Sequence, residues 1–321
     1  MCCITGTFVR ELENPMRSVD VHTHGIGGFD TRQASVDALA RVAALHGAVG
    51  VSDIVLSLYP DSIPKMRGQM ELVHQTMERQ RSAFIRQPSA EISGRRPRDP
   101  GADTAAARII GIHLEGPFLN RLHCGALNPS FFIDPDQHFF ERLTDGFEDV
   151  IRVMTIAPEL QGAEPLIRNA CNAGIVVSMG HSDATYAEAE AGFNAGARGI
   201  THLFNAMRGI HHREPGLAGF GLLHEEVYAE VIADPFHIHT GVLELIFRTK
   251  KSNRILLVSD SAKETATGGR KIVDASGRLQ GGSMTIPEAA RRLIDLGFDT
   301  EAVMRAISTN PASYLNITAE E

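Results

Sequence analysis

Eight short apolar runs recur along the chain, and helix-like segments separate several of them. The runs have the length and residue types of buried strands and cover residues 19–24, 49–58, 107–115, 150–157, 174–181, 198–204, 228–234 and 254–260. Short strands that alternate with helices are typical of parallel βαβ units, which build either a barrel or a doubly wound sheet. Eight repeats favour an α/β fold of the TIM (β/α)8 barrel type over an open sheet.

The segments between and after these runs add detail to the predicted barrel. Helical patterns occur at 63–81, 184–197, 241–251, 286–296 and 299–309. Residues 271–284, with turn residues near Ser276 and Gly277, predict a hairpin after the eighth strand. The stretch at about 80–106 is polar and rich in Arg, Pro and Gly, so we expect a surface insertion there.

Composition excludes several classes of function. The 321 residues carry a formal net charge of −8, which argues against a nucleic-acid partner because such proteins present a basic face. No apolar stretch approaches the roughly 18 residues that a membrane span needs. The four cysteines lack metal-type spacing, and the amino terminus lacks the pattern of a signal peptide. These features predict a cytoplasmic protein with reduced thiols and no membrane partner.

Histidines and carboxylates stand at the ends of nearly all the predicted strands. His22 and His24, in the stretch "VDVHTHG", point to the same side because side chains alternate along a strand. Other strand ends carry Glu115, His181, His202, Asp234, His237 and Asp260. The carboxyl ends of the strands of a TIM barrel meet at one rim. A single histidine there is usually structural, but this many in register predict a site for a divalent metal.

Six motifs occur in the order and approximate spacing of one branch of the amidohydrolase superfamily. They are "HTHG", "GIHLEGPFLN", "GHSDA", "THLFNAM", "REPG" and "LVSD". With them, residues 19–313 closely resemble the N-acetylglucosamine-6-phosphate deacetylase family. The resemblance implies a metal-dependent amidohydrolase barrel over 19–313. Residues 1–18 then correspond to a remnant of an accessory β-sandwich that is truncated or absent here, and 314–321 to a tail.

The resemblance also implies a set of metal ligands. In the family, the residues at the positions of Glu115, His181 and His202 hold the principal metal. Some members use a pair at the positions of His22 and His24 for a second metal. We therefore expect one or two divalent ions, most simply zinc, with iron, manganese or cobalt as alternatives.

Catalytic and substrate-binding roles follow from the same resemblance. Asp260 corresponds to the residue that takes a proton from the nucleophilic water and returns it to the leaving amine. Asn205, Ala206, Arg213 and His237 correspond to contacts with a phosphorylated amino sugar. In the family the arginine can come from a neighbouring subunit, which implies a homodimer.

The chain departs from the family pattern within the site. Leu127 stands where the family has a histidine that polarises the acetyl carbonyl, and leucine cannot donate a hydrogen bond. His123 is a candidate replacement. "ADPFHIH" places Pro235 before His237, which suggests an altered position and makes His239 a further candidate.

The segment after Asp260 also differs from the family. It carries Lys263 and Glu264, which suggest contacts with a different substrate. The leading hypothesis is hydrolysis of N-acetylglucosamine 6-phosphate to glucosamine 6-phosphate and acetate. Two alternatives stay open because of Leu127. One is an amidohydrolase for a different acyl or cyclic amide, and the other is a catalytically silent protein that binds a metal and a sugar phosphate.

Overall fold

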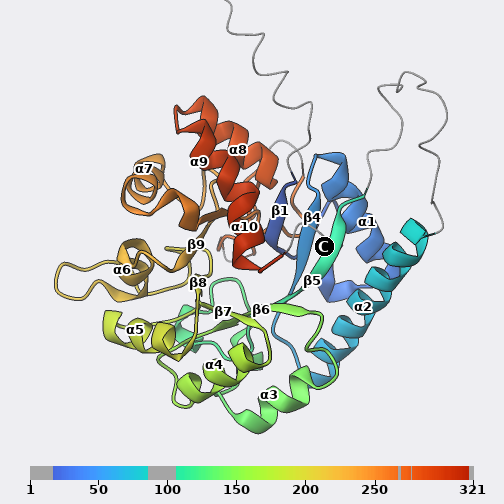
Figure 1. Ribbon diagram of the computed structural model, residues 1–321, viewed down its shortest axis with the longest axis horizontal. Coiled ribbons are helices and arrows are strands. Elements are labelled where there is room, and N and C mark those ends of the chain that lie inside the picture. The colour runs from blue at the N-terminus through green and yellow to red at the C-terminus, as the bar shows by residue number, and fades with distance from the viewer. Residues whose placement is uncertain (1–16, 86–105, 267–268, 276, 318–321) are drawn as a thin grey trace, which may run out of the picture.

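The computed structural model describes residues 17–85, 106–266, 269–275 and 277–317. Its centre is an eight-stranded parallel sheet whose strands follow one another in chain order (Figure 1). The strands are β1 (Val19–Thr23), β4 (Asp53–Leu58), β5 (Arg108–Leu114), β6 (Ile151–Ile156), β7 (Val176–Met179), β8 (Gly199–Ile200), β9 (Tyr228–Val231) and β10 (Ile255–Leu257). Each of the eight predicted strands is therefore confirmed.

The first and last strands of the sheet meet, so that the sheet forms a nearly closed barrel. Thr23 at the end of β1 forms a parallel bridge with Ser261, which follows β10. The Asp260 backbone N–H donates to the His22 carbonyl at 2.8 Å, and the His24 N–H donates to the Ser261 carbonyl at 2.8 Å. The predicted (β/α)8 barrel is confirmed.

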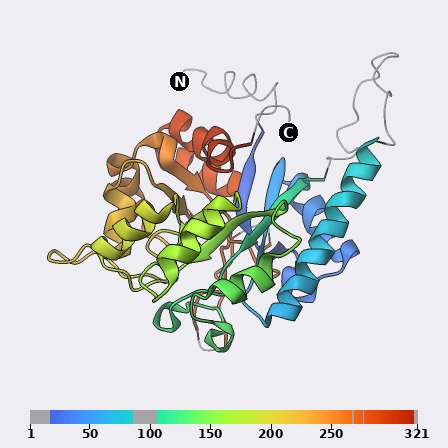
Figure 2. The same ribbon diagram turned by 60° about the horizontal axis from the view of Figure 1, so that its bottom comes forward.

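Ten α-helices within the described residues surround the sheet (Figures 1 and 2). They are α1 (Val36–Ala48), α2 (Ile63–Ile85), α3 (Gln137–Thr144), α4 (Ala163–Asn172), α5 (Tyr186–Ala195), α6 (Gly216–Leu223), α7 (Thr240–Thr249), α8 (Ile286–Asp295), α9 (Thr300–Ile307) and α10 (Thr309–Tyr314). The strands β2 (Gly25–Ile26) and β3 (Phe29–Asp30) pair in antiparallel orientation and form a two-stranded hairpin. Short 3₁₀ turns are η2 (Thr31–Gln33), η3 (Arg121–His123), η4 (Pro129–Phe131) and η5 (Ser252–Arg254).

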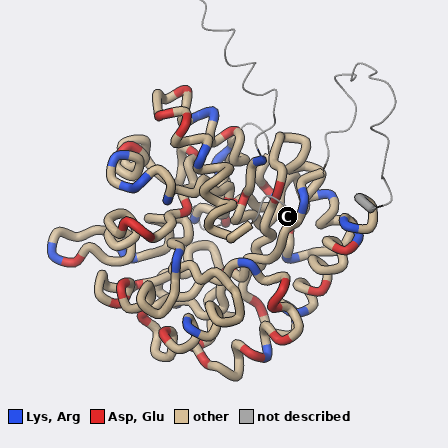
Figure 3. Tube along the Cα trace, in the orientation of Figure 1, with Lys and Arg blue, Asp and Glu red and all other residues tan. Residues whose placement is uncertain are grey.

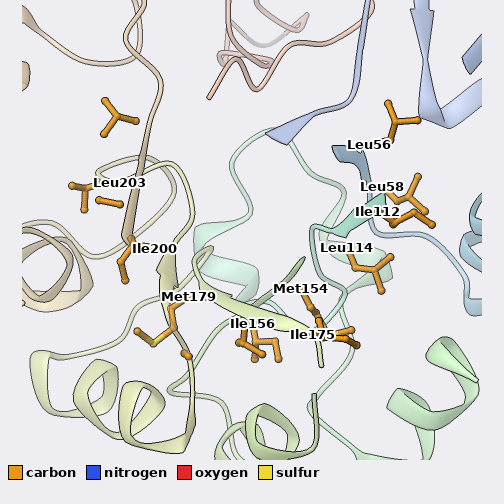
Figure 4. Packing of buried hydrophobic residues seen from close by; sticks show 14 of the residues in the cluster. Leu56, Leu58, Ile112, Leu114, Met154, Ile156, Ile175, Met179, Ile200 and Leu203 are labelled. Atoms are coloured by element: carbon orange, nitrogen blue, oxygen red, sulfur yellow. The ribbon is translucent and has the colours of Figure 1, made fainter. Parts of the chain in front are cut away.

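Buried aliphatic side chains fill the space between the strands and the surrounding helices (Figure 4). Along β4 and β5, alternate residues such as Leu56, Leu58, Ile112 and Leu114 are fully buried in this core. Helix α2 contributes apolar positions three and four residues apart, namely Met66, Met70, Val73 and Met77. This spacing puts one face of the helix against the barrel. On the outer helices, acidic and basic residues are interspersed (Figure 3).

Several segment boundaries differ from the sequence expectation. Helix α2 continues to Ile85, beyond the predicted end at residue 81. Residues 86–105 of the predicted insertion, residues 1–16 and residues 318–321 lie outside the described parts of the chain. The predicted hairpin at 271–284 forms, because Val273 bridges Leu279 and the Asp274 N–H donates to the Arg278 carbonyl. Over the described residues, no helix is both long enough and apolar enough to cross a membrane.

The buried imidazole of His46 gives a prediction for stability. Burial lowers the pKa of His46 from 6.5 to about 4, and its Nε2 lies 3.1 Å from the Thr23 hydroxyl. The unfolded chain therefore binds more protons between pH 6.5 and 4. The stabilisation from keeping His46 neutral is complete above pH 6.5 and falls as pH drops toward 4.

We expect the free energy of unfolding of the wild-type protein to fall over this window more steeply than that of His46→Gln. The difference in slope should be about 1.4 kcal/mol per pH unit. Denaturant unfolding at a series of pH values measures it. Because the other buried histidines titrate in both proteins, equal slopes would contradict the prediction.

Candidate metal centre

Three side chains from separate strand ends meet at the carboxyl rim of the barrel. Glu115 follows β5, His181 follows β7 and His202 follows β8. The Glu115 Oε1 atom lies 3.1 Å from His181 Nε2 and 3.2 Å from His202 Nε2, and these two nitrogens are 3.1 Å apart. All three residues are buried. The structure thus brings together the predicted principal ligands.

A second group adjoins the first. Asp260 Oδ1 lies 3.3 Å from His22 Nε2 and 3.6 Å from His24 Nε2. The Glu115 carboxylate contacts this group as well, with Oε2 at 3.2 Å from His24 Nε2 and Oε1 at 3.5 Å from His22 Nε2. In each group, the candidate ligand atoms lie within 4.8 Å of one another. One carboxylate therefore lies between two potential metal positions.

Backbone carbonyls fix the orientation of two of the imidazoles. His24 Nδ1 donates to the Ser57 carbonyl at 3.0 Å, and His181 Nδ1 donates to the His123 carbonyl at 2.8 Å. A carbonyl oxygen can only accept, so Nδ1 carries a proton, and in that neutral tautomer Nε2 presents a lone pair to the site. Second contacts of this kind are typical of metal-binding histidines.

Buried polar atoms that lack hydrogen-bond partners indicate whether a metal ion fits among these residues. Within the described parts of the chain, His22 Nε2 and Glu115 Oε2 are buried without a hydrogen-bond partner. Convergent imidazole lone pairs and a carboxylate repel one another unless a cation lies between them. The nitrogen and carboxylate donors suit zinc and related divalent ions. The residues present therefore fit a metal, and their arrangement has room for one or two ions.

Glu230 on β9 is a part of the site that the sequence prediction missed. Its Oε2 lies 3.0 Å from His22 Nδ1 and 3.4 Å from the His202 backbone nitrogen. It therefore contacts one residue of each group. Burial raises the pKa of Glu230 to about 8. The available signal was a glutamate within the otherwise apolar run "YAEVIA", where a carboxylate needs a buried partner.

The two carboxylates that face the histidines differ in their ionisation. Burial, together with the nearby charge of Glu115, raises the pKa of Asp260 to about 8. Burial also disfavours the ionised form of Glu115. The close imidazoles of His181, His202 and His24 nevertheless hold the pKa of Glu115 well below its usual range. Asp260 is therefore protonated more readily than Glu115, and a group that transfers protons needs this property.

The backbone carries strain at three of these positions. His181, His202 and Asp260 have φ values of 49°, 32° and 45°. Residues other than glycine adopt this left-handed region at a cost of about 1–3 kcal/mol each, and such residues cluster at functional sites. The surrounding barrel holds these side chains in place against that cost.

A pocket with a volume of about 310 Å³ opens onto the two groups. Three of the four predicted substrate contacts line it, namely Asn205, Ala206 and His237. Further lining residues that the sequence prediction missed are Arg32, Tyr59, Arg278, Leu279 and Gln280. Tyr59 stacks on the His24 ring at 3.8 Å between centroids, and the central carbon of the Arg32 guanidinium lies 3.6 Å from the centroid of the Tyr59 ring. The pocket thus combines buried ligands with a partly cationic wall.

Pro235 does not displace His237 from the pocket. Asp234 accepts from the His237 backbone N–H at 2.8 Å, and its second oxygen lies 3.0 Å from His237 Nδ1. The Asp234 carboxylate thereby fixes both backbone and ring. His239, the further candidate, instead accepts from the Gly241 N–H at the start of α7 and does not line the pocket.

Two other predicted residues lie away from the pocket lining. The His123 ring pairs with Asp183 at 3.0 Å and does not line the pocket. Arg213 is exposed, with Nη1 at 2.9 Å from His212 Nε2, and does not line the pocket of its own chain. Leu127 does line the pocket and is 5% exposed.

Barrel and site together define a class of protein. Histidine and carboxylate ligands at the ends of the strands, with a strained aspartate after the eighth, are the arrangement of a metal-dependent amidohydrolase.

Comparisons with known proteins narrow this class. N-acetylglucosamine-6-phosphate deacetylase of Vibrio furnissii is 30% identical, in a match that covers 93% of this chain and 73% of that protein. N-acetylgalactosamine-6-phosphate deacetylase of Escherichia coli O157:H7 is 29% identical over 93% of this chain and 77% of that protein. No protein-family model matches the chain.

A solved structure agrees with the sequence comparison. A mutant N-acetyl-D-glucosamine-6-phosphate deacetylase from Mycobacterium smegmatis, in complex with N-acetyl-D-glucosamine-6-phosphate, superposes with a TM-score of 0.79. Its sequence is 30% identical, and the match covers 94% of this chain and 77% of that one. The chain belongs to the N-acetylglucosamine-6-phosphate deacetylase family, as the sequence motifs predicted.

The central carboxylate gives a prediction for metal binding. Glu115→Gln keeps the side-chain shape but removes the charge that faces the four histidines. We expect metal affinity to fall by at least about 100-fold, so that dialysed protein contains less than one ion per chain. Inductively coupled plasma mass spectrometry measures the metal content.

Glu264→Gln is the matched control, because Glu264 lines the same pocket but belongs to neither ligand group. It should retain the metal content of the wild-type protein. Full metal content in Glu115→Gln would contradict the assignment of Glu115.

Proposed function

We propose that the protein removes the acetyl group from an N-acetyl amino sugar 6-phosphate, converting N-acetylglucosamine 6-phosphate and water to glucosamine 6-phosphate and acetate. The convergence of Asp260 and Glu115 on four histidine Nε2 atoms at the base of a pocket carries this proposal. The relatives and the superposed structure, by their names, act on or bind substrates of this kind.

The metal in this proposal is held by the two groups already described. Glu115, His181 and His202 would hold the first ion, and His22 with His24 would share Glu115 for a second. We propose zinc, with iron, manganese and cobalt as alternatives that the same donors accept. A divalent ion there supplies Lewis acidity, which acidifies water and polarises a carbonyl oxygen.

Asp260 moves the proton in this proposal. As a carboxylate it accepts a proton from the water that attacks the acetyl carbonyl carbon. It then donates that proton to the sugar nitrogen as the C–N bond breaks, so that acetate and a free amine leave. The Asp260 side chain is only 13% exposed, which limits the access of bulk water, and its contacts with His22 and His24 fix the carboxylate beside the ligands.

The remaining pocket residues would bind the sugar. The Asn205 side chain donates to the backbone of the preceding turn, which fixes its position at the rim. Ala206 has a left-handed φ of 48° and lies at the pocket wall. His237, fixed by Asp234, faces the same space. Because one relative is named for the galactosamine epimer, both epimers belong among the test substrates.

Leu127 favours a second candidate, an amidohydrolase for a different acyl or cyclic amide. It is buried against Leu119 and Phe132, with Tyr59 packed on the same cluster. It therefore presents an apolar wall where family members present a hydrogen-bond donor. An apolar wall of this kind suits a larger acyl group better than an acetyl oxygen.

The homodimer and the cytoplasmic location stay predictions from the sequence.

Acetate release is the first test. Zinc-loaded wild-type protein should release acetate from N-acetylglucosamine 6-phosphate, or from its galactosamine epimer, in a coupled acetate assay. Asp260→Asn should lower kcat by about 10²–10⁴-fold, because it removes the group that transfers the proton. Metal-loaded wild-type protein that releases no acetate from either epimer would overturn the proposal and favour other amides or a binding role.

Leu127→His tests the second candidate. A histidine at this wall restores a hydrogen-bond donor toward the acetyl carbonyl, so we expect kcat for the N-acetyl sugar to rise by about tenfold or more. Leu127→Met is the control for altered packing and should stay near the wild-type rate. A fall in kcat with histidine would indicate that the apolar wall itself serves the natural acyl group.

A further inference from the structure

We propose that Arg278 binds the anionic 6-phosphate of the substrate from within the same chain, an inference that rests on the proposed function. Arg278 belongs to the hairpin that follows β10, and it lines the pocket. The family resemblance assigns phosphate binding to Arg213, which is exposed and does not line the pocket of its own chain. Because family members can supply that arginine from a neighbouring subunit, Arg278 would be a further contact from within the same chain.

Arg278 joins the hairpin to the loop that contains Gly125, which also lines the pocket. Its Nη1 donates to the Gly125 carbonyl at 3.3 Å. A Cβ placed on Gly125 would lie 3.3 Å from Ala206 Cβ and 3.5 Å from His181 Cε1. Gly125 therefore lies between the Arg278 guanidinium and the residues Ala206 and His181.

The exposure of the Arg278 side chain is consistent with binding the phosphate of the substrate rather than its reacting amide. Its side chain is 56% exposed, whereas that of Glu115 is 3% exposed. The acetyl group has to reach the buried ligands at the base of the pocket. The sugar ring then extends outward, and its 6-phosphate lies at the rim, where a dianion keeps part of its hydration. A guanidinium there meets the phosphate without full desolvation of either charge.

Asp274 holds the guanidinium in a defined orientation. Arg278 Nε donates to Asp274 Oδ2 at 3.0 Å, and the Arg278 backbone N–H donates to Asp274 Oδ1 at 3.0 Å. The carboxylate offsets part of the positive charge on the Nε side. The expected contribution to phosphate binding is therefore directed hydrogen bonding by the planar guanidinium, which suits phosphate oxygens.

A second arginine in the pocket supplies a matched control. Arg32 also lines the pocket, but its guanidinium lies over Tyr59, on the side of the site occupied by His24. Arg278→Gln and Arg32→Gln remove the same charge from the same pocket. A general electrostatic effect on an anionic substrate would be lost in both variants, whereas a specific contact would be lost only in the first.

The test compares phosphorylated and unphosphorylated sugars. For Arg278→Gln, we expect KM for N-acetylglucosamine 6-phosphate to rise about 10- to 100-fold with little change in kcat. Its kcat/KM for unphosphorylated N-acetylglucosamine should stay near that of the wild-type protein. Calorimetric binding of both sugars to Asp260→Asn, with and without Arg278→Gln, measures the same selectivity without turnover.

Each outcome separates this proposal from the proposed function. Wild-type acetate release combined with a selective loss for the phosphorylated sugar in Arg278→Gln supports the proposal. Equal losses for both sugars, equal effects in Arg32→Gln, or a selective loss in Arg213→Gln instead would overturn it while the deacetylase function stands. If the wild-type protein neither binds nor hydrolyses either sugar, the proposed function fails, and the proposal fails with it.

Discussion

The site depends on one buried carboxylate that faces four imidazoles. Glu115 lies where the strand ends meet, and its two oxygens contact nitrogens contributed by β1, β7 and β8. Neutral imidazoles that turn their lone pairs toward a carboxylate repel it, and a cation among the members of the cluster removes that repulsion. The closure of the barrel brings these groups together and fixes the distances between them.

Hydrogen bonds to the far sides of the imidazole rings keep the rings in this orientation. The carbonyls of Ser57 and His123 and the carboxylate of Glu230 hold three of the rings in place. Without these partners, a ring could turn its N–H toward Glu115 and satisfy the carboxylate without a metal. The backbone strain at His181 and Asp260 also shows that the fold fixes these residues, because it maintains conformations that the local chain disfavours.

The limits of sequence reasoning show most clearly at the pocket wall. The family resemblance assigned Asn205, Ala206 and His237 to substrate contacts, and all three line the pocket. His123 was a candidate for the same wall, but its ring pairs with Asp183 instead. In a loop, side-chain direction depends on partners far away in the chain, and local spacing does not record them.

The sequence by itself determined the order and type of the elements and the chemistry at their ends. The short apolar runs and the residues that follow them, such as Glu115 and Asp260, depend on local patterning and residue chemistry. Only the tertiary structure decided that Glu230 supports His22 and that Arg278, rather than Arg213, lines the pocket of its own chain. These contacts are between residues that are distant in sequence. They form only because the closed barrel and its loops bring those residues together.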